Sequence, residues 1–355
     1  MKPRILIVGA GIGGLTLAHA LRQRGLSFDI VDQAERWEPV GAGFGLWSNA
    51  LRVFDRLGLL ERVIAAGVRF TGGDVMDARG RLLTRVRYTS PDARIPVGVA
   101  LLRHELHEVL RDGIDVRLGT TIASRAGYDL VVGADGVHSR VRELFWGPVE
   151  LRDSGYTSWR FVVPVDLPLA GPTEWWGAGM RTGLVAMTHG RTYGFATMNV
   201  PATFDDPLPG RLARFRENFR GFGEPFGTAL SALSRDDELI HARLGDLRLN
   251  RWTKPGAVLL GDAAHAMTPN VAQGAAMAIE DAWVLADCIA RDALHEYEVK
   301  RRSRVEWVQN LSWRFGVVGQ WSAPLAVAAR ALALRLTPRR AAPCQLASLL
   351  NGGPC

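Results

Sequence analysis

RILIVGAGIGGLTLAHALRQRG, residues 4–25, contains the strongest fold signal in the chain. It opens with a β-branched run that is typical of a strand buried on both faces. A glycine-rich turn follows, and then leucines and alanines recur at helical spacing until Gly25 ends the helix. Residues 28–32, FDIVD, predict a second strand. These residues therefore predict a βαβ unit of about 30 residues.

The glycines of this turn form the pattern G-x-G-x-x-G at Gly9, Gly11 and Gly14, with a further glycine at Gly13. In a dinucleotide-binding turn the first glycine makes the tight bend and the second lets the backbone approach a pyrophosphate. The third lets the helix pack on the strand, and the helix N-terminus favours the anion. Asp32 lies close to the spacing expected for a carboxylate that accepts a ribose hydroxyl hydrogen bond. The pattern predicts a dinucleotide site but does not distinguish NAD from FAD.

Composition limits the classes of protein that the chain can belong to. With 355 residues, 47% hydrophobic and 22% charged, it is typical of a folded globular protein and not of a disordered or multi-span membrane chain. The net charge is +7, but the basic residues are nearly all arginines scattered among acidic ones, so we expect no nucleic-acid partner. The three cysteines, Cys288, Cys344 and Cys355, lack metal-like or disulfide-like spacing. We therefore expect no metal site and a cytoplasmic location.

Two later segments extend the nucleotide-binding pattern. GADGVHSRVR, residues 133–142, places Asp135 and Gly136 at a strand-to-turn junction. LLGDAAHAMTPNVAQGAAMAIEDA, residues 259–282, places Gly261 and Asp262 at another strand end, ahead of a proline and a helix. With these motifs in this order, the chain resembles the single-component (group A) FAD-dependent monooxygenases. That family includes the para-hydroxybenzoate, salicylate and urate hydroxylases, and the resemblance covers essentially the whole chain.

The predicted fold is α/β, with a Rossmann-like FAD-binding domain interleaved with an antiparallel-sheet substrate domain and followed by C-terminal helices. Residues 152–250 are rich in Trp, Thr, Val, Phe and Gly, which favours strands. Helices are expected over 49–67, 103–111 and 274–291. The predicted boundaries are 1–70, 100–151 and 251–291 for the FAD-binding domain, 71–99 and 152–250 for the substrate domain, and 292–355 for the C-terminal helical segment.

The tail contains an apolar portion, GVVGQWSAPLAVAARALALRL, at residues 316–336. Pro324, Arg330 and Arg335 interrupt it, so a packing helix or a membrane-surface patch is favoured over a membrane span. We expect no stable membrane insertion. The sequence leaves the oligomeric state open.

The resemblance implies FAD as the cofactor and assigns residues to it. Asp262 would hold the ribityl chain, Arg103 would lie along the ribityl and pyrophosphate groups, and Asp135 would support both FAD and a visiting nicotinamide nucleotide. Two alternatives remain: Asp135 caps a turn, or Arg103 pairs with an acidic neighbour. A helix that begins at Gly274 would direct its positive end towards the reduced flavin. The chain departs from the Gly-Gln-Gly of many relatives because Ala272 replaces the first glycine.

The resemblance also implies a reaction. NADH or NADPH would bind transiently as the reductant, because the chain has only one G-x-G-x-x-G pattern. Dioxygen would form a flavin C4a-hydroperoxide that hydroxylates a planar aromatic, heteroaromatic or polyketide-like small molecule. Within the fold, the alternative is an FAD-dependent epoxidase or a tetracycline-type inactivating hydroxylase. Outside it, the alternative is a non-catalytic flavin-binding partner protein.

Candidate substrate residues are less clearly indicated than the FAD residues. Arg160, Pro269 and Asn270 are the candidates to position the substrate. Asn270 stands where urate hydroxylases carry an acidic residue, which disfavours urate. The candidates to line the pocket are Trp47, Trp176, His189 and Phe195. The alternatives are an Arg160 that closes a domain interface, a His189 exposed in a turn, and aromatic side chains that fill space between the sheet and the FAD-binding domain.

Overall fold

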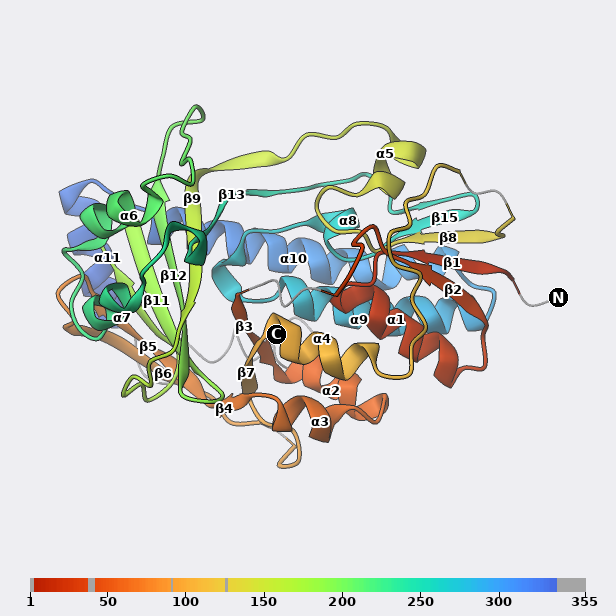
Figure 1. Ribbon diagram of the computed structural model, residues 1–355, viewed down its shortest axis with the longest axis horizontal. Helices are drawn as coiled ribbons and strands as arrows, with labels where there is room; N and C mark the ends of the chain where they lie inside the picture. The colour runs from red at the N-terminus through yellow and green to blue at the C-terminus, as the bar shows by residue number, and fades with distance from the viewer. Residues whose placement is uncertain (1–2, 38–41, 91, 125–126, 337–355) are drawn as a thin grey trace.

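The computed structural model describes residues 3–37, 42–90, 92–124 and 127–336. Figure 1 shows a nucleotide-binding half around β1, β2 and β8, a large sheet at the opposite end, and α10 running from one half to the other. The α/β fold with C-terminal helices is the one predicted.

A five-stranded sheet forms the nucleotide-binding half. In spatial order its strands are β14 (Thr253–Lys254), β15 (Ala257–Leu259), β8 (Leu130–Gly133), β1 (Ile5–Val8) and β2 (Phe28–Val31). The last four are parallel, and every residue of β1 and β8 is buried, as their continuous apolar sequences require. Helices α1 (Ile12–Gln23) and α9 (Gly274–Ala290) pack against each other on this sheet, while α5 (Arg140–Trp146) and α8 (Asp262–His265) follow β8 and β15.

A small antiparallel sheet lies beside this half, with β7 (Gly98–Leu102) between β3 (Gly43–Trp47) and β4 (Val68–Phe70). The helices nearby are α2 (Ser48–Arg56), α3 (Leu60–Ala65) and α4 (Arg103–Arg111). The single helix expected over 49–67 is wrong: Gly58, with φ +72°, separates α2 from α3. A positive φ is easily adopted by glycine and ends a helix.

A seven-stranded sheet forms the opposite half. In spatial order its strands are β13 (Ile240–Asp246), β9 (Arg152–Val163), β12 (Arg191–Asn199), β11 (Met180–Met187), β10 (Thr173–Trp176), β5 (Gly72–Asp77) and β6 (Leu82–Arg87). All neighbours are antiparallel except β10 and β5, which are parallel, so the sheet is mixed and not purely antiparallel as expected.

The two faces of this sheet have different coverings. One face packs Trp159 and Phe161 against α6 (Arg211–Phe219) and α7 (Phe226–Ala232), two helices that the strand-like composition of 152–250 did not predict. The other face is turned towards β3 and the C-terminal helices. That face therefore borders whatever lies between the two halves.

The C-terminal helices are α10 (His295–Gly319) and α11 (Pro324–Leu336). Pro324 is the first residue of α11 and does not interrupt a helix, since proline is well tolerated there. Among residues 3–336 with the stated gaps, no single helix is long and apolar enough to cross a membrane. Only α10 and α11 taken together reach that length and composition, and they are bent by 120°. Cys344 and Cys355 lie outside the described residues.

Candidate active site

A cleft of about 400 Å³ opens where α1, α9, β3 and β9 meet. Its lining includes Gly11 and Gly13 at one end and Arg160 and Pro269 at the other. A second hollow of about 190 Å³ continues it towards Asp32, and the two share Gly11, Arg103, Ala134 and Gly136. The result is one elongated site at the carboxyl ends of the parallel strands, the usual position for a dinucleotide.

The glycine turn is shaped by close contacts on one side and open space on the other. A Cβ on Gly9, where φ is +102°, would lie 2.4 Å from the oxygen of Ala134. A Cβ on Gly14 would lie 1.9 Å from the oxygen of Gly9. A Cβ on Gly11 would meet no described atom within 4 Å and would project into the cleft. This open cradle at the N-terminus of α1 fits a pyrophosphate.

Asp32 holds the turn and borders the second hollow. Its carboxylate accepts hydrogen bonds from the backbone N–H groups of Ala10, at 2.7 Å, and Ala34, at 2.9 Å. The two oxygens keep further acceptor capacity. Asp32 therefore both fixes the glycine turn and faces the place where a ribose would lie.

Asp262 and Arg103 face each other across the main cleft. Gly261, with φ +60°, turns the chain from β15 into α8 and so directs Asp262 into the cleft. Asp262 is reached by solvent through the cleft but is otherwise surrounded by protein. Its side chain is exposed in the open cleft, but desolvation by the protein around it raises the pKa of its carboxyl group, and the charges of His265 and Arg103 oppose the rise only in part. A carboxylate held there at neutral pH is a strong acceptor for a hydroxyl group of a ligand.

Asp135 has a structural role that its motif left open. Its carboxylate accepts hydrogen bonds from Ser139 Oγ, at 2.5 Å, and from the backbone N–H of Val141, at 3.0 Å. Both carboxylate oxygens are thus engaged at the N-terminus of α5. Asp135 caps this helix and lines the second hollow, so any contact with a cofactor would be additional to the cap.

The loop before α9 brings a helix N-terminus to the cleft. Ala272 adopts a left-handed conformation, with φ +49°, after the short 3-10 helix Pro269–Val271. Gly274 then begins the 17-residue helix α9 and lines the cleft. The departure from glycine at Ala272 is therefore accommodated without loss of the turn.

Buried ion pairs fix α9 behind the cleft. Asp281 accepts hydrogen bonds from His265 Nε2 and Arg301 Nε, both at 2.6 Å. Burial alone would raise the pKa of Asp281, but the charges of His265 and Arg301 hold it below its usual range. Glu280 accepts from Arg301 at 2.6 Å and from Asn49 Nδ2 at 2.7 Å. This network ties α8, α9, α10 and α2 together. It places His265 in packing and not in the cleft.

Arg160 supplies a cation at the far end of the cleft. It lies on β9 and lines the cleft, and its enclosed Nε has no hydrogen-bond partner among the described residues. A buried N–H without a partner is costly unless a ligand accepts its hydrogen bond. Arg160 is therefore well placed to bind an oxygen atom of a bound molecule.

An apolar cluster lies directly behind Gly43 in the cleft wall. A Cβ on Gly43 would meet the side chains of Met187 and Tyr193 at 2.6 and 2.8 Å. The cluster consists of Ala42, Phe70, Ala100, Leu102, Met187 and Tyr193, with partly buried Trp47, Val162, Val185 and Phe195 around them. Trp47 and Phe195 thus belong to this cluster, although neither lines the cleft itself. Burial raises the pKa of Tyr193 to about 12, so its phenol stays neutral.

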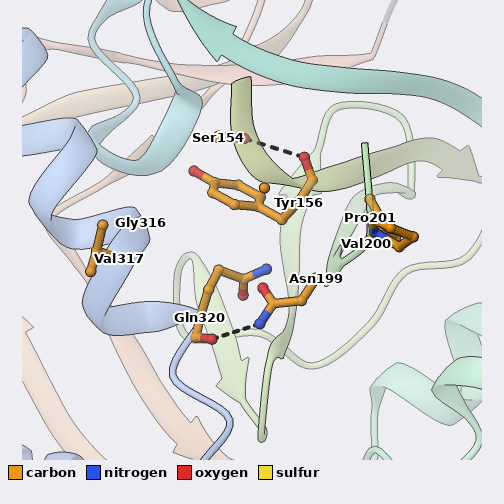
Figure 2. Close-up of a pocket in the computed structure, with 9 residues that line it drawn as sticks. Ser154, Tyr156, Asn199, Val200, Pro201, Gly316, Val317 and Gln320 are labelled. Atoms are coloured by element: carbon orange, nitrogen blue, oxygen red, sulfur yellow. Dashed lines mark hydrogen bonds between the residues drawn. The ribbon is translucent and has the colours of Figure 1, made fainter. Parts of the chain in front are cut away.

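Pro269 and Asn270 face opposite directions. Pro269 lines the cleft, whereas Asn270 does not. The Asn270 amide donates to Tyr156 Oη at 2.8 Å and to the Ser312 backbone oxygen at 2.9 Å, and it accepts from Arg181. Because these contacts use its polar atoms, direct positioning of a substrate by Asn270 is not supported. Tyr156 instead lines a separate surface hollow of about 450 Å³ between β9, β12 and α10 (Figure 2).

Trp176 and His189 also lie away from the cleft. Trp176 donates to Glu174 at 2.8 Å and stacks with Arg181 and Arg330, so it packs under α11. His189 is exposed in the turn between β11 and β12, with φ +60°. Both residues are corrections to the predicted pocket.

Several cleft residues were not singled out from the sequence: Phe44, Ile240, Met267 and Thr268. Met267 and Thr268 directly precede Pro269, so their position in the motif was an available signal. Ile240 had no local signal, since it reaches the cleft only because β13 pairs with β9 opposite Arg160.

The fold and the elongated cleft are those of a dinucleotide-binding enzyme whose cleft extends to Arg160 and Ile240. The chain belongs to the FAD binding domain family, whose model matches residues 2–126 and 115–311. It is accordingly an FAD-dependent monooxygenase with NADH or NADPH as the reductant. The recognition, the fold class and the cofactor predicted from the sequence are confirmed.

Individual relatives cover nearly the whole chain. It is 36% identical to the 2-heptyl-3-hydroxy-4(1H)-quinolone synthase of Pseudomonas aeruginosa, over 94% of each chain. It is also 36% identical to the aurachin C monooxygenase/isomerase of Stigmatella aurantiaca, again over 94% of each. Among solved structures it is similar to a variant of Klebsiella pneumoniae HpxO complexed with FAD, with a TM-score of 0.88 and 25% identity over 99% of this chain and 100% of that one.

Proposed function

We propose that this monooxygenase hydroxylates a planar N-heteroaromatic compound of the 4(1H)-quinolone class that carries an apolar substituent. The observation that carries the proposal is that one cation, Arg160, lines the cleft together with the apolar side chains of Phe44, Ile240 and Met267. The name of the 36% identical relative from Pseudomonas aeruginosa supports the same substrate class.

Arg160 would bind the carbonyl or enol oxygen attached to the ring of such a substrate. A quinolone presents one carbonyl oxygen, and its enol form presents a hydroxyl that can lose a proton. The guanidinium donates to either form, and it favours the anion because the charges are opposite. A more electron-rich ring is more readily hydroxylated. Arg160 is therefore proposed as a substrate-positioning and charge-stabilising residue.

Apolar side chains of the cleft wall would accept the substituent and exclude water. Phe44, Ile240 and Met267 line the cleft together with Arg160. Burial of apolar surface stabilises binding by about 25 cal/mol per Å². Exclusion of water from this end of the cleft also protects reactive intermediates from breakdown by water.

At the other end, the cleft residues would hold FAD, which supplies the redox chemistry that activates dioxygen when bound. Asp262 would accept a hydrogen bond from a ribityl hydroxyl, Asp32 from a ribose hydroxyl, and the N-terminus of α1 would face the pyrophosphate. Arg103 supplies a positive charge beside the same path. The N-terminus of α9 at Gly274 would favour negative charge on the reduced cofactor.

The reductant and the setting follow from less specific features. NADH or NADPH would visit the site transiently, since the sequence has one G-x-G-x-x-G pattern only. No group of three or more potential metal ligands occurs among the described residues. The cysteine pattern supports a reducing, cytoplasmic setting.

The proposal is tested with FAD-loaded protein by following NADH and NADPH oxidation and hydrogen peroxide release with a panel of substrates. The panel contains 2-alkyl-4(1H)-quinolones, urate, hydroxybenzoates, tetracyclines and an alkene. The expected result is that 2-alkylquinolones accelerate oxidation and suppress peroxide, while the unsubstituted quinolone does so more weakly. Acceleration by a tetracycline or an alkene alone would replace the proposal with inactivation or epoxidation. Bound flavin with no acceleration by any quinolone would contradict it.

A further inference from the structure

Helix α11 has a buried arginine and exposed leucines. Arg330 is only 4% exposed, and its guanidinium donates to the backbone oxygens of Gly319 at 2.6 Å and Gly177 at 2.7 Å. Leu325 and Leu336, in contrast, are 87% and 70% exposed. A helix that simply packs on its own protein has the opposite arrangement.

The exposed leucines of α11 lie on one side of the helix. Leu325, Leu332 and Leu336 are spaced by seven and four residues, which places them on one face of the helix, with Ala328 and Ala329 between them. Val317 and Trp321, at the end of α10, are also exposed. We call this surface the α11 face: Val317, Trp321, Leu325, Ala328, Ala329, Leu332 and Leu336. Figure 1 shows α11 at the end of the molecule remote from the five-stranded sheet.

The last part of the sequence carries charge of one sign. Glu306 is the last acidic residue of the chain, and residues 307–355 contain five arginines and no lysine or acidic residue. Five of the seven net positive charges therefore belong to this last part of the sequence. Arg314 is exposed on α10, one turn before Val317. Arg335 lies 3.8 Å from Asp77, but that carboxylate is already bound at 2.7 Å by Arg81.

We propose that the α11 face binds the surface of an anionic phospholipid bilayer. Leucines enter the boundary between headgroups and acyl chains, Trp321 lies at the interface, and arginines contact lipid phosphates. The 120° bend between α10 and α11 lets α11 lie along the membrane while α10 stays packed in the protein. The proposed binding is peripheral, with α11 lying along the membrane surface.

The positive charge of residues 307–355 favours an anionic bilayer over a second copy of the chain as the partner of the α11 face. Two α11 faces in contact would bury their leucines, but they would also bring together two segments that carry only positive charge. Like charges brought close destabilise such an association, whereas anionic lipid is complementary to them. The proposal does not depend on the substrate, since the cleft contains no residue of α11.

The test uses FAD-loaded protein and vesicles of phosphatidylcholine, with or without about one-third phosphatidylglycerol, in a flotation assay. We expect binding to anionic vesicles that weakens with added salt. The variant L325S/L332S/L336S should lose binding at least tenfold. The control variant L208S/V299S removes two exposed apolar side chains elsewhere, 46% and 79% exposed, and should bind like the wild type.

Two results would overturn the proposal. One is a flotation assay in which the wild type does not float with anionic vesicles, or in which the L325S/L332S/L336S variant floats as well as the wild type. The other is a wild-type dimer in light scattering that this variant converts to a monomer without any vesicle binding. Retained flavin absorbance in all variants shows that they are folded, so loss of vesicle binding then reports on the α11 face alone.

Discussion

Arg160 on β9 and Phe195 on β12 lie directly opposite each other in the antiparallel register, so their side chains leave the seven-stranded sheet on the same face. On the other side of β9, Ile240 of β13 also pairs with Arg160. Arg160 therefore lies between Phe195 and Ile240 in the sheet, and it lines the cleft together with Ile240. This arrangement suits a flat molecule with one polar oxygen.

Replacement of Arg160 should impair substrate use and leave the cofactor in place. Arg160→Gln should lower kcat/KM for the accepted quinolone by about 10- to 100-fold, since it removes a charge-assisted hydrogen bond to the substrate. Arg160→Lys keeps the charge but loses the planar donor geometry, so its kcat/KM should lie between those of the wild type and Arg160→Gln. Steady-state NAD(P)H oxidation measures this, with the flavin spectrum as the control. Unchanged kinetics for Arg160→Gln would remove this residue from the site.

The glycine turn offers a matched pair of substitutions. Gly11→Ala adds a methyl group that meets no described protein atom within 4 Å, so the variant should fold. It should nevertheless lose FAD affinity by about tenfold or more, because the methyl group occupies the cofactor's cradle. Gly14→Ala would bring Cβ to 1.9 Å from the Gly9 oxygen and should destabilise the fold itself. FAD titration and thermal melting separate the two effects; Gly11→Ala with wild-type affinity would contradict the assignment.

Asp262 should lower the stability of the apoprotein and strengthen the binding of FAD. Its pKa is raised in the folded protein, so an ionised Asp262 destabilises the apoprotein, and this cost grows as pH rises above the ordinary carboxyl pKa of about 4. Apo Asp262→Asn should therefore melt higher than apo wild type at neutral pH. The difference should shrink towards low pH, where both forms are uncharged. The same variant should bind FAD more weakly. Calorimetry of the apoproteins at several pH values measures this difference. A lower melting temperature for Asp262→Asn than for the wild type at every pH would refute the explanation.

The buried ion pairs behind α9 should dominate stability. Arg301→Met leaves Asp281 and part of the Glu280 charge without their buried partner and should cost about 3–5 kcal/mol in the free energy of unfolding. Arg291→Met, which breaks exposed pairs with Asp287 and Glu296, should change the melting temperature little. Denaturant titration compares the two variants. Equal effects would show that the buried network has no special weight.

The sequence predicted the nucleotide-binding half well because each of its elements is signalled within one short segment of the chain. The strand-turn-helix of residues 5–23 and the strand end before Asp262 each occupy one short segment with its own glycine chemistry. The break at Gly58 was missed because leucines continue at helical spacing on both sides of it.

The substrate end was harder to predict because it depends on pairing between distant strands. Trp176 pairs with Arg181, and that register turns it towards Arg330 and α11. Asn270 is only one residue from Pro269, yet its amide points to Tyr156 and Ser312. Arg160 reaches the cleft, but only the order of β13, β9 and β12 shows which side chains accompany it. Composition alone contains none of these pairings.

The defining step of the proposed reaction is the transfer of one atom of dioxygen to a quinolone-type ring. It is followed by turnover of a 2-alkyl-4(1H)-quinolone with FAD, NADH or NADPH, and ¹⁸O₂, with mass spectrometry of the product. We expect a hydroxylated quinolone that carries one labelled oxygen atom. Full consumption of the reductant with only labelled hydrogen peroxide, or a product whose new oxygen comes from water, would rule this reaction out.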